Sequence, residues 1–291
     1  MTIKEAEQKM IDAYDSYSFP DRQMLTEAVR FLADETHDPE HVTHLGSLYQ
    51  EDGRHDLALR CYEESAASGD PHALAALGLM WKNGDTGTID YAKAFDCFSE
   101  AAAKGITDAE CDLADMYRYG QHVAKDYGRY CEMIEAMYQR IKDVKWYDEP
   151  VADVSARLAE IRREQGRTDE AVKLMHDARL AQTAVLEYLP QSDELKTMER
   201  MTDILYGMTE CDMTDLGLFD LFHLFRKPCK VAFRYDGESY EAEAALEDGR
   251  IAVRFGSEWY RSVGSLLENA CIGDDRLATL SDEIYGMEVI R

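Results

Sequence analysis

Residues 73–105 read ALAALGLMWKNGDTGTIDYAKAFDCFSEAAAKG, and this stretch decides the fold. Leu77 and Trp81 share one face of a first helix, and Gly84 is placed to end it, since glycine readily takes the left-handed conformation of a helix C-terminus. The apolar residues that follow recur at intervals of three and four: Ala94, Cys97, Phe98, Ala101 and Ala102. The stretch therefore predicts two helices packed as a hairpin.

The same pattern occurs before and after this stretch. Leu45, Leu77 and Leu113 lie 32 and 36 residues apart, and Gly69 and Gly105 lie 36 apart. A single hairpin exposes its second apolar flank, so neighbouring hairpins must stack on both sides. The repeat therefore predicts a solenoid rather than a globule.

The residues of the second unit carry a family resemblance. The string A-x-x-x-L-G-x-x-W-x-x-G from Ala73, followed by D-x-x-K-A from Asp90 and by A-A-x-G, resembles the Sel-one-like repeat (SLR), a relative of the tetratricopeptide repeat. The third unit has Ala114 in place of the glycine, and a degenerate fourth unit is expected over 156–178. The resemblance covers roughly residues 38–180 and implies an α-solenoid that binds proteins or peptides as an adaptor.

The flanking segments extend this organisation. Two helical stripes precede the repeats, the second beginning near Pro20, and further helical patterns follow Pro190. We expect four regions: N-terminal capping helices (1–37), SLR repeats (38–141), tetratricopeptide-like and connecting helices (142–227), and a small α+β domain (228–291).

After Pro228 the apolar period changes from that of a helix to two. Asp236-Gly237 and Asp248-Gly249 are tight-turn signals between three predicted strands. The strands should form an antiparallel β-meander, with residues 288–290 as an edge strand. Helical segments after Tyr260 should cover its apolar face with five side chains: Leu266, Leu267, Leu277, Leu280 and Ile284. The expected fold class is mainly α, an α-solenoid with a small C-terminal α+β domain.

Composition limits the partners. The formal charge is −26, the isoelectric point is near 4.6, and the mean hydropathy is −0.45. This charge disfavours nucleic acid and anionic membranes. No apolar run approaches the ~18 residues that span a bilayer, and the opening MTIKEAEQKM does not resemble a signal peptide. We expect a cytoplasmic protein.

The sequence supplies no catalytic or metal-binding constellation. Its seven cysteines form no C-x-x-C pair. His37, His41 and His44 have ligand-like spacing, but Pro39 should start a helix after His37, which favours packing or capping roles. No nucleophile triad, phosphate-binding glycine loop or H-E-x-x-H motif is present. We expect no enzyme, no cofactor and no metal.

Tetratricopeptide geometry, applied by analogy, predicts which side chains line the concave wall. Lys82, Arg118 and Tyr119 would offer cations and aromatic area to a peptide. The predicted binding residues are Gln50, Glu51, His72, Leu79, Lys82, Asn83, Asp115, Arg118 and Tyr119, with Ser47 beside them. The resulting hypothesis is a non-catalytic adaptor for a protein or peptide, and a solvated helix face is the alternative reading of the same residues.

Two rival functions stay open at this stage. The meander with a helix after a Tyr-x-Ser stretch weakly resembles RAMA modules, which are associated with modified-DNA recognition, and would imply a nucleic-acid reader. Residues 228–291 contain seven basic and thirteen acidic residues, which opposes that interpretation. The other rival is an enzyme whose site forms between the solenoid and the C-terminal module.

Overall fold

The structure is a computed structural model of the 291-residue chain. It describes residues 1–15, 22–144, 150–188, 192–209, 218–247, 250–273, 275–280 and 284–290. The chain forms two compact units, residues 1–133 and 134–291. Pro20, Pro190 and the predicted turn at 248–249 lie outside the described residues.

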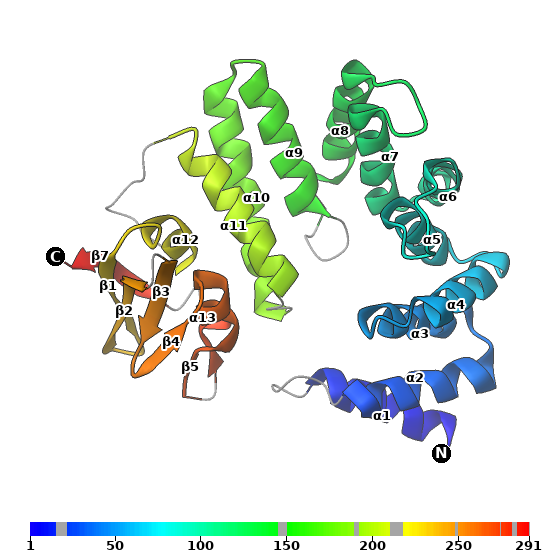
Figure 1. Ribbon diagram of the computed structural model, residues 1–291, viewed down its shortest axis with the longest axis horizontal. Coiled ribbons are helices and arrows are strands. Elements are labelled where there is room, and N and C mark those ends of the chain that lie inside the picture. The colour runs from blue at the N-terminus through cyan, green and yellow to red at the C-terminus, as the bar shows by residue number, and fades with distance from the viewer. Residues whose placement is uncertain are drawn as a thin grey trace. The chain divides into compact units, whose positions relative to one another are not determined.

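The first unit is a run of antiparallel helices in which each helix contacts the next one along the chain (Figure 1). The helices are α1 (Ile3–Asp15), α2 (Arg22–Thr36), α3 (Pro39–Glu51), α4 (His55–Ala67), α5 (Pro71–Asn83), α6 (Tyr91–Ala103) and α7 (Thr107–Tyr119). The boundary between the units falls within α8 (Tyr127–Ile141). The predicted stack of helix hairpins is confirmed.

Aspartate side chains cap the N-termini of α3, α5 and α6. The carboxylates of Asp38, Asp70 and Asp90 each accept a hydrogen bond from a backbone N–H two residues later, at 3.0, 2.9 and 3.1 Å. At the other end, Gly84 and Gly120 adopt φ of 83° and 73° at the C-caps of α5 and α7. The helix boundaries are therefore set locally.

The repeat leucines occupy equivalent places. Leu45, Leu77 and Leu113 are each the seventh residue of a 13-residue helix. Leu45 and Leu77 are buried and Leu113 is half-buried. One apolar cluster runs from α2 to α5, and another from α5 to α7, so the interior continues from hairpin to hairpin. This spacing confirms the repeat inferred from sequence.

Glycine lets the two helices of a hairpin approach closely. A methyl group added at Gly78 would lie 2.5 Å from Cε1 of Phe98 on α6, and one at Gly46 would lie 2.7 Å from Cε1 of Tyr62 on α4. Tyr62 and Phe98 are both the eighth residue of their helix. The absence of a side chain at Gly46 and Gly78 is therefore what admits an aromatic ring.

After the C-terminal part of α8, the second unit continues with three helices that pack in chain order, α9 (Val151–Glu164), α10 (Thr168–Tyr188) and α11 (Ser192–Tyr206). The α9–α10 pair turns at Gly166, with φ of 75°, and buries Leu158, Ile161, Ala171 and Ala178. Those are landmarks of the predicted fourth hairpin.

The last helical segment before the sheet is described from residue 218 onward, and residues 210–217 lie outside the described residues. A 3₁₀ turn, η1 (Leu218–Asp220), leads there into a single turn of helix, α12 (Leu221–Leu224). Leu221, Phe222 and Phe225 are buried. The apolar spacing correctly located a buried segment, but the chain turns toward the sheet after one helical turn.

The C-terminal sheet has five antiparallel strands in the order β4-β3-β2-β1-β7. The strands are β1 (Cys229–Tyr235), β2 (Glu238–Glu247), β3 (Arg250–Phe255), β4 (Glu258–Tyr260) and β7 (Tyr285–Ile290). Asp236 and Gly237, both with positive φ, form the predicted turn between β1 and β2. The meander and the edge strand at 288–290 are confirmed, and β4 is an additional strand too short for a periodicity argument.

The cover of the sheet differs in part from expectation. Helix α13 (Val263–Asn269) is present and is followed by two short strands, β5 (Cys271–Ile272) and β6 (Asp275–Arg276), which pair with each other. In the described residues of the segment expected to form a second helix, the helical part is η2 (Leu277–Leu280), directly after β6. All five predicted covering side chains, Leu266 to Ile284, are buried. A short 3₁₀ turn can bury apolar side chains against a sheet as a helix does. The apolar residues of this segment therefore predicted more helix than the structure has.

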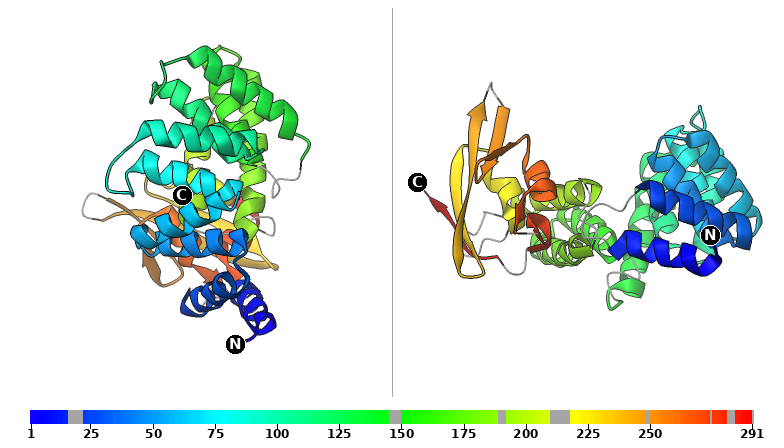
Figure 2. Two further views of the ribbon diagram at one scale, coloured as in Figure 1. Left: turned by 90° about the vertical axis from the view of Figure 1, so that its right-hand side faces the viewer. Right: turned by 90° about the horizontal axis from the view of Figure 1, so that it is seen from below.

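One apolar cluster joins the sheet to the preceding helices. It contains Leu186 of α10, Met198 of α11 and Phe233 of β1, together with the residues of α13 and η2. The right-hand view of Figure 2 shows the helices on one face of the sheet. The module and the helices before it thus share a core within the second unit.

Candidate functional site

The predicted binding residues fall at repeated positions of three helices. Counting from the first residue of α3, α5 and α7, position 12 holds Gln50, Lys82 and Arg118, and position 13 holds Glu51, Asn83 and Tyr119. Position 9 holds Ser47, Leu79 and Asp115, and His72 is at position 2 of α5. We call this set the α3–α5–α7 face.

The first two side chains at position 12 are half-buried and bind within the chain. The amide oxygen of Gln50 accepts a hydrogen bond from the Tyr62 hydroxyl at 3.0 Å, and its nitrogen lies 3.5 Å from a carboxylate oxygen of Asp85. Lys82 Nζ forms an ion pair with Asp112 of α7 at 2.7 Å. The Tyr62 contact lies within the α3–α4 hairpin, whereas the Asp85 and Asp112 contacts link one repeat to the next, so position 12 contributes to holding the stack together.

Arg118 repeats this behaviour with an aromatic partner. Its Nη1 donates to the Tyr130 hydroxyl at 3.1 Å, and its guanidinium carbon lies 4.9 Å from the centroid of that ring. The same carbon lies 5.6 Å from the Tyr119 ring. Tyr127 stacks on Tyr130 with centroids 5.6 Å apart. Arg118 is therefore held by its own chain, and a peptide carboxylate would have to compete for it.

Positions 2, 9 and 13 are more open. The exposed fraction is 60% for Tyr119 and 37% for Leu79, and His72 and Asn83 are also exposed. Glu51 is exposed but forms an ion pair with Arg22 of α2, while Asp115 and Ser47 are half-buried. Most of the predicted residues thus fall into two groups. The fastening row consists of Gln50, Lys82 and Arg118, and the accessible row consists of His72, Leu79, Asn83 and Tyr119.

A second candidate lies in the second unit and was not predicted. A cavity of about 400 Å³ lies among the C-terminal half of α8, the α9 C-terminus and the first half of α10. We call it the α8–α10 groove. The residues that line it are Glu135, Tyr138, Gln139, Leu158, Arg162, Arg167, Glu170, Lys173, Leu174 and Asp177.

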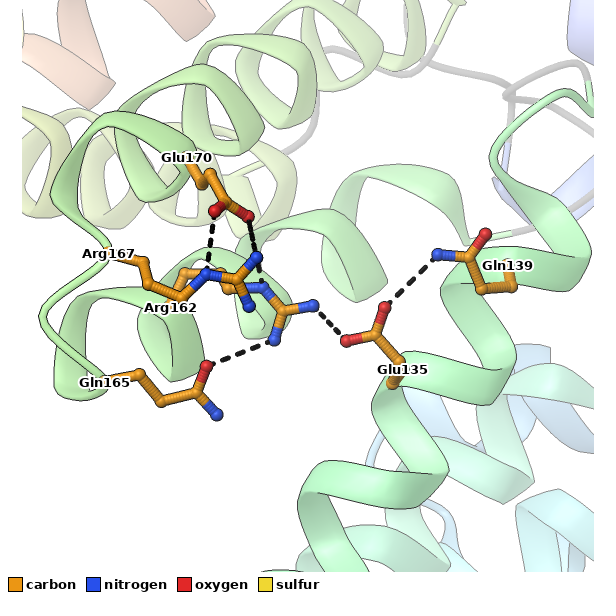
Figure 3. Close-up of polar contacts among 6 residues, drawn as sticks. All are labelled: Glu135, Gln139, Arg162, Gln165, Arg167 and Glu170. Carbon is orange, nitrogen blue, oxygen red and sulfur yellow. Dashed lines mark hydrogen bonds and ion pairs between the residues drawn. The ribbon is translucent and has the colours of Figure 1, made fainter.

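A chain of ion pairs forms one wall of the groove (Figure 3). Arg162 is paired with Glu135 of α8 through Nη2, and its Nε lies 3.6 Å from Glu170 of α10. Arg167 binds both oxygens of Glu170, at 2.7 and 2.5 Å. Gln165 accepts from Nη1 of Arg162 at 3.3 Å. Because only 11% of the Arg162 side chain is exposed, it acts as a strut between helices.

The groove perturbs two titrating groups. Burial raises the pKa of Glu135, but hydrogen bonds from Arg162 and Gln139 outweigh it, so this pKa lies below its usual value. Burial raises the pKa of the Tyr138 hydroxyl, and the nearby carboxylates of Asp177, Asp143 and Glu135 raise it further. Tyr138 therefore remains a neutral hydroxyl at physiological pH.

Sequence reasoning missed the groove although a signal was present. The stretch RREQGR at 162–167 concentrates three arginines around a helix-ending glycine in a chain with 58 acids and 32 bases. Its acidic partners, Glu135 and Glu170, come from different helices. The arginine cluster was readable from sequence, but its convergence with those carboxylates was not.

The exposed face of the sheet carries its own polar row across four strands. Lys230 lies 3.9 Å from Glu243, and Arg254 is paired with the same carboxylate. The guanidinium of Arg254 lies 5.7 Å from the ring of Trp259 on β4. Both cations of this row thus share the Glu243 carboxylate, and Arg254 also lies near the Trp259 ring.

The parts of the chain that the structure describes contain no assembled site for a metal ion or for a reactive thiol. No group of three or more His, Cys, Asp or Glu side chains converges there. His41 Nδ1 instead lies 3.1 Å from the Thr36 hydroxyl. Burial raises the pKa of the Cys61 and Cys97 thiols, which disfavours the reactive thiolate.

Every helix in the described residues is too short or too polar to cross a bilayer.

Comparison with protein families bears on the first unit. The family model for the tetratricopeptide repeat matches residues 42–74, which run from α3 into the start of α5. The structure repeats that hairpin at α5–α6. The chain carries tetratricopeptide-like helical repeats. No curated protein matches the sequence of this repeat protein.

Three solved structures of repeat proteins align with about 70% of this chain. A Sel1 repeat protein from Oxalobacter formigenes shares 17% identity at a TM-score of 0.47, over 70% of this chain and 90% of that one. A protective antigen of uropathogenic Escherichia coli with an SLR fold shares 17% identity at 0.45, over 71% and 52%. A tetratricopeptide repeat protein from Parabacteroides merdae shares 14% identity at 0.42, over 70% and 73%.

Proposed function

We propose that this repeat protein is a non-catalytic interaction scaffold that binds a protein or peptide on the α3–α5–α7 face. The observation that carries the proposal is that exposed side chains of the face lie next to side chains that are held within the chain. Leu79, Asn83 and Tyr119 are exposed at repeated positions, and each lies within three residues of a position-12 side chain that is fastened within the chain. A rigid backing with exposed apolar and aromatic groups suits recognition, because little side-chain freedom is lost on binding.

The charge of the first unit favours a partner with net positive charge. Residues 1–133 contain 26 acidic and 12 basic residues. The two cations of the face, Lys82 and Arg118, already have partners within the chain. Long-range attraction therefore favours a basic polypeptide, and association should slow as salt is added.

A capture experiment tests this proposal with a matched control. The full chain and a Leu79→Ser/Tyr119→Ala variant would be used to capture proteins from a cell extract, and each captured protein would be purified and titrated against both. Leu180→Ser is the control, since Leu180 is 70% exposed on α10 of the other unit. We expect a partner that binds the wild type and the control equally and the double variant at least tenfold more weakly.

Unchanged thermal unfolding of the double variant would show that the loss is one of contact rather than of fold. Equal affinity of every partner for all three proteins would refute the proposed face.

We propose a reducing, cytoplasmic location for the scaffold. The six cysteines in the described residues are all free thiols, which is typical of that compartment. Fractionation of cells that produce the tagged chain tests this directly.

A further inference from the structure

The α8–α10 groove presents a different selection of groups from the face described above. Leu158 and Leu174 are buried and form its floor, whereas Lys173 and Asp177 are exposed at its mouth. The exposed side chains at its mouth leave the groove accessible to side chains of another chain. Its volume of about 400 Å³ suffices for a few side chains.

The ion-paired wall is not available to a ligand. Arg162 directs its Nη1, Nη2 and Nε toward Gln165, Glu135 and Glu170. Arg167 directs two nitrogens to the same Glu170 carboxylate. Breaking these contacts would leave charged groups without a partner, which is unfavourable. The ion pairs therefore stay formed and give the groove its shape.

Two opposite charges remain after that pairing. Lys173 and Asp177 lie four residues apart on α10, and neither forms a hydrogen bond or ion pair with another residue in the described parts of the chain. Side chains at this spacing are about 5–6 Å apart and lie on one helix face. Tyr138, on the facing helix α8, adds a neutral hydroxyl whose pKa is raised by its surroundings.

We propose that the α8–α10 groove is a second binding site, separate from the α3–α5–α7 face, that takes a peptide segment bearing one acidic and one basic side chain on the same face. The acidic side chain pairs with Lys173 and the basic one with Asp177. An apolar side chain between them covers Leu174.

Charge complementarity decides the class of occupant. A purely anionic ligand would meet Asp177, Glu135 and Glu170, and a purely cationic one would meet Lys173, Arg162 and Arg167. Only a segment that carries both signs satisfies the two unpaired groups at once. The matching spacing is two residues in an extended peptide or three to four in a helical one.

Selection from a random dodecapeptide phage library on the full chain tests this site. Selected peptides would be synthesised and their affinities measured for the wild type and for the charge swap Lys173→Asp/Asp177→Lys. The matched control is Arg129→Glu/Glu132→Arg, which swaps an exposed helical charge pair that does not line the groove. Thermal unfolding checks that each variant is folded.

The expected result has two parts. Selected peptides are enriched in an acidic and a basic residue two to four positions apart, and they lose at least tenfold in affinity on the charge swap while the control changes them less than twofold. Failure to select any peptide, selection of peptides with one sign of charge only, or equal binding to the charge swap would overturn the proposal.

A further variant separates this site from the proposed function. Leu79→Ser/Tyr119→Ala alters the other unit and should leave the affinity of the selected peptides unchanged. If that variant abolished their binding, the peptides would occupy the α3–α5–α7 face and the groove proposal would be wrong.

Discussion

The α3–α5–α7 face and the α8–α10 groove both hold charged side chains in place through contacts within the chain, but they distribute these contacts differently. In the face, polar groups at position 12 of α3, α5 and α7 bind within the chain, as the 2.7 Å ion pair between Lys82 and Asp112 shows. In the groove, the pairing is concentrated on one nearly buried arginine, Arg162. The face therefore spreads its fastening over a repeat, whereas the groove depends on a single strut.

This difference teaches how far a repeat pattern predicts function. Gln50, Lys82 and Arg118 occupy the same position of three repeat helices, as the repeat pattern predicts. Whether such a side chain can bind a ligand depends on its contacts with residues of neighbouring helices, and the repeat pattern does not predict those contacts. A charged residue at a repeat position is thus as suited to joining repeats as to holding a ligand.

The largest effect on stability should come from a substitution that forces α5 and α6 apart. Gly78→Ala would place a methyl group 2.5 Å from the Phe98 ring. Because that ring is fully buried, the helices must separate, and we expect a loss of about 2–3 kcal/mol in the free energy of unfolding. Urea unfolding followed by circular dichroism measures it.

Gly128→Ala is the control for that substitution. Gly128 is also helical, but an added methyl group would meet only a carboxylate oxygen of Asp126 at 3.4 Å. Alanine there should leave stability unchanged or raise it by up to about 1 kcal/mol. Equal effects of the two substitutions would contradict the close-packing explanation.

Removing the strut should be the next largest change. Arg162→Met leaves Glu135 without its ion-pair partner, and we expect a loss of about 1–2 kcal/mol in urea unfolding. Arg167→Met, at a side chain 48% exposed, should cost less than about 0.5 kcal/mol. Similar losses for both arginines would show that the wall has no single strut.

A double-mutant cycle sharpens the claim that position 12 fastens repeats. Lys82→Met and Asp112→Asn, made singly and together, should show a coupling of about 1 kcal/mol, since both side chains are only about one-fifth exposed. Additive effects would mean that the ion pair contributes nothing to the stack.

The smallest effect concerns pH. Burial lowers the pKa of His44 on α3, His41 and Arg22 lower it further, and Glu51 and Glu40 partly oppose them. The unfolded chain therefore takes up this proton first, so stability should fall as pH decreases through about 6.5 toward the lower folded pKa. His44→Gln should flatten the dependence of unfolding free energy between pH 7 and 5 by less than about 1 kcal/mol, and an identical slope would exclude His44 as its source.

Sequence predicted the fold wherever the relevant signal was local. The leucines at 45, 77 and 113, the aspartate caps and the Asp236-Gly237 turn all act within a few residues, and the structure has each of them. β4 escaped because three residues show no period, and the segment around Leu277 was taken for helix because burial alone does not distinguish a 3₁₀ turn.

The candidate sites were predicted less completely for a physical reason. Asp112 lies 30 residues from Lys82, and Glu135 lies 27 from Arg162, so their pairing depends on how hairpins pack. Periodicity places a side chain on a face but does not identify what crosses from the next helix. Leu79 and Tyr119 were therefore among the predicted residues, but only the packed structure distinguishes them, as exposed side chains, from Lys82 and Arg118, which are held within the chain.

The central claim is that positions 9 and 13 of the repeat helices bind while position 12 holds the stack together. Titration of a captured, purified partner against Leu79→Ser/Tyr119→Ala and against Lys82→Met, with thermal unfolding of both, tests it most directly. The first variant should bind at least tenfold more weakly with unchanged unfolding, and the second should bind within threefold of the wild type but unfold at lower temperature. The opposite assignment, with binding lost at Lys82 and stability lost at Tyr119, would contradict it.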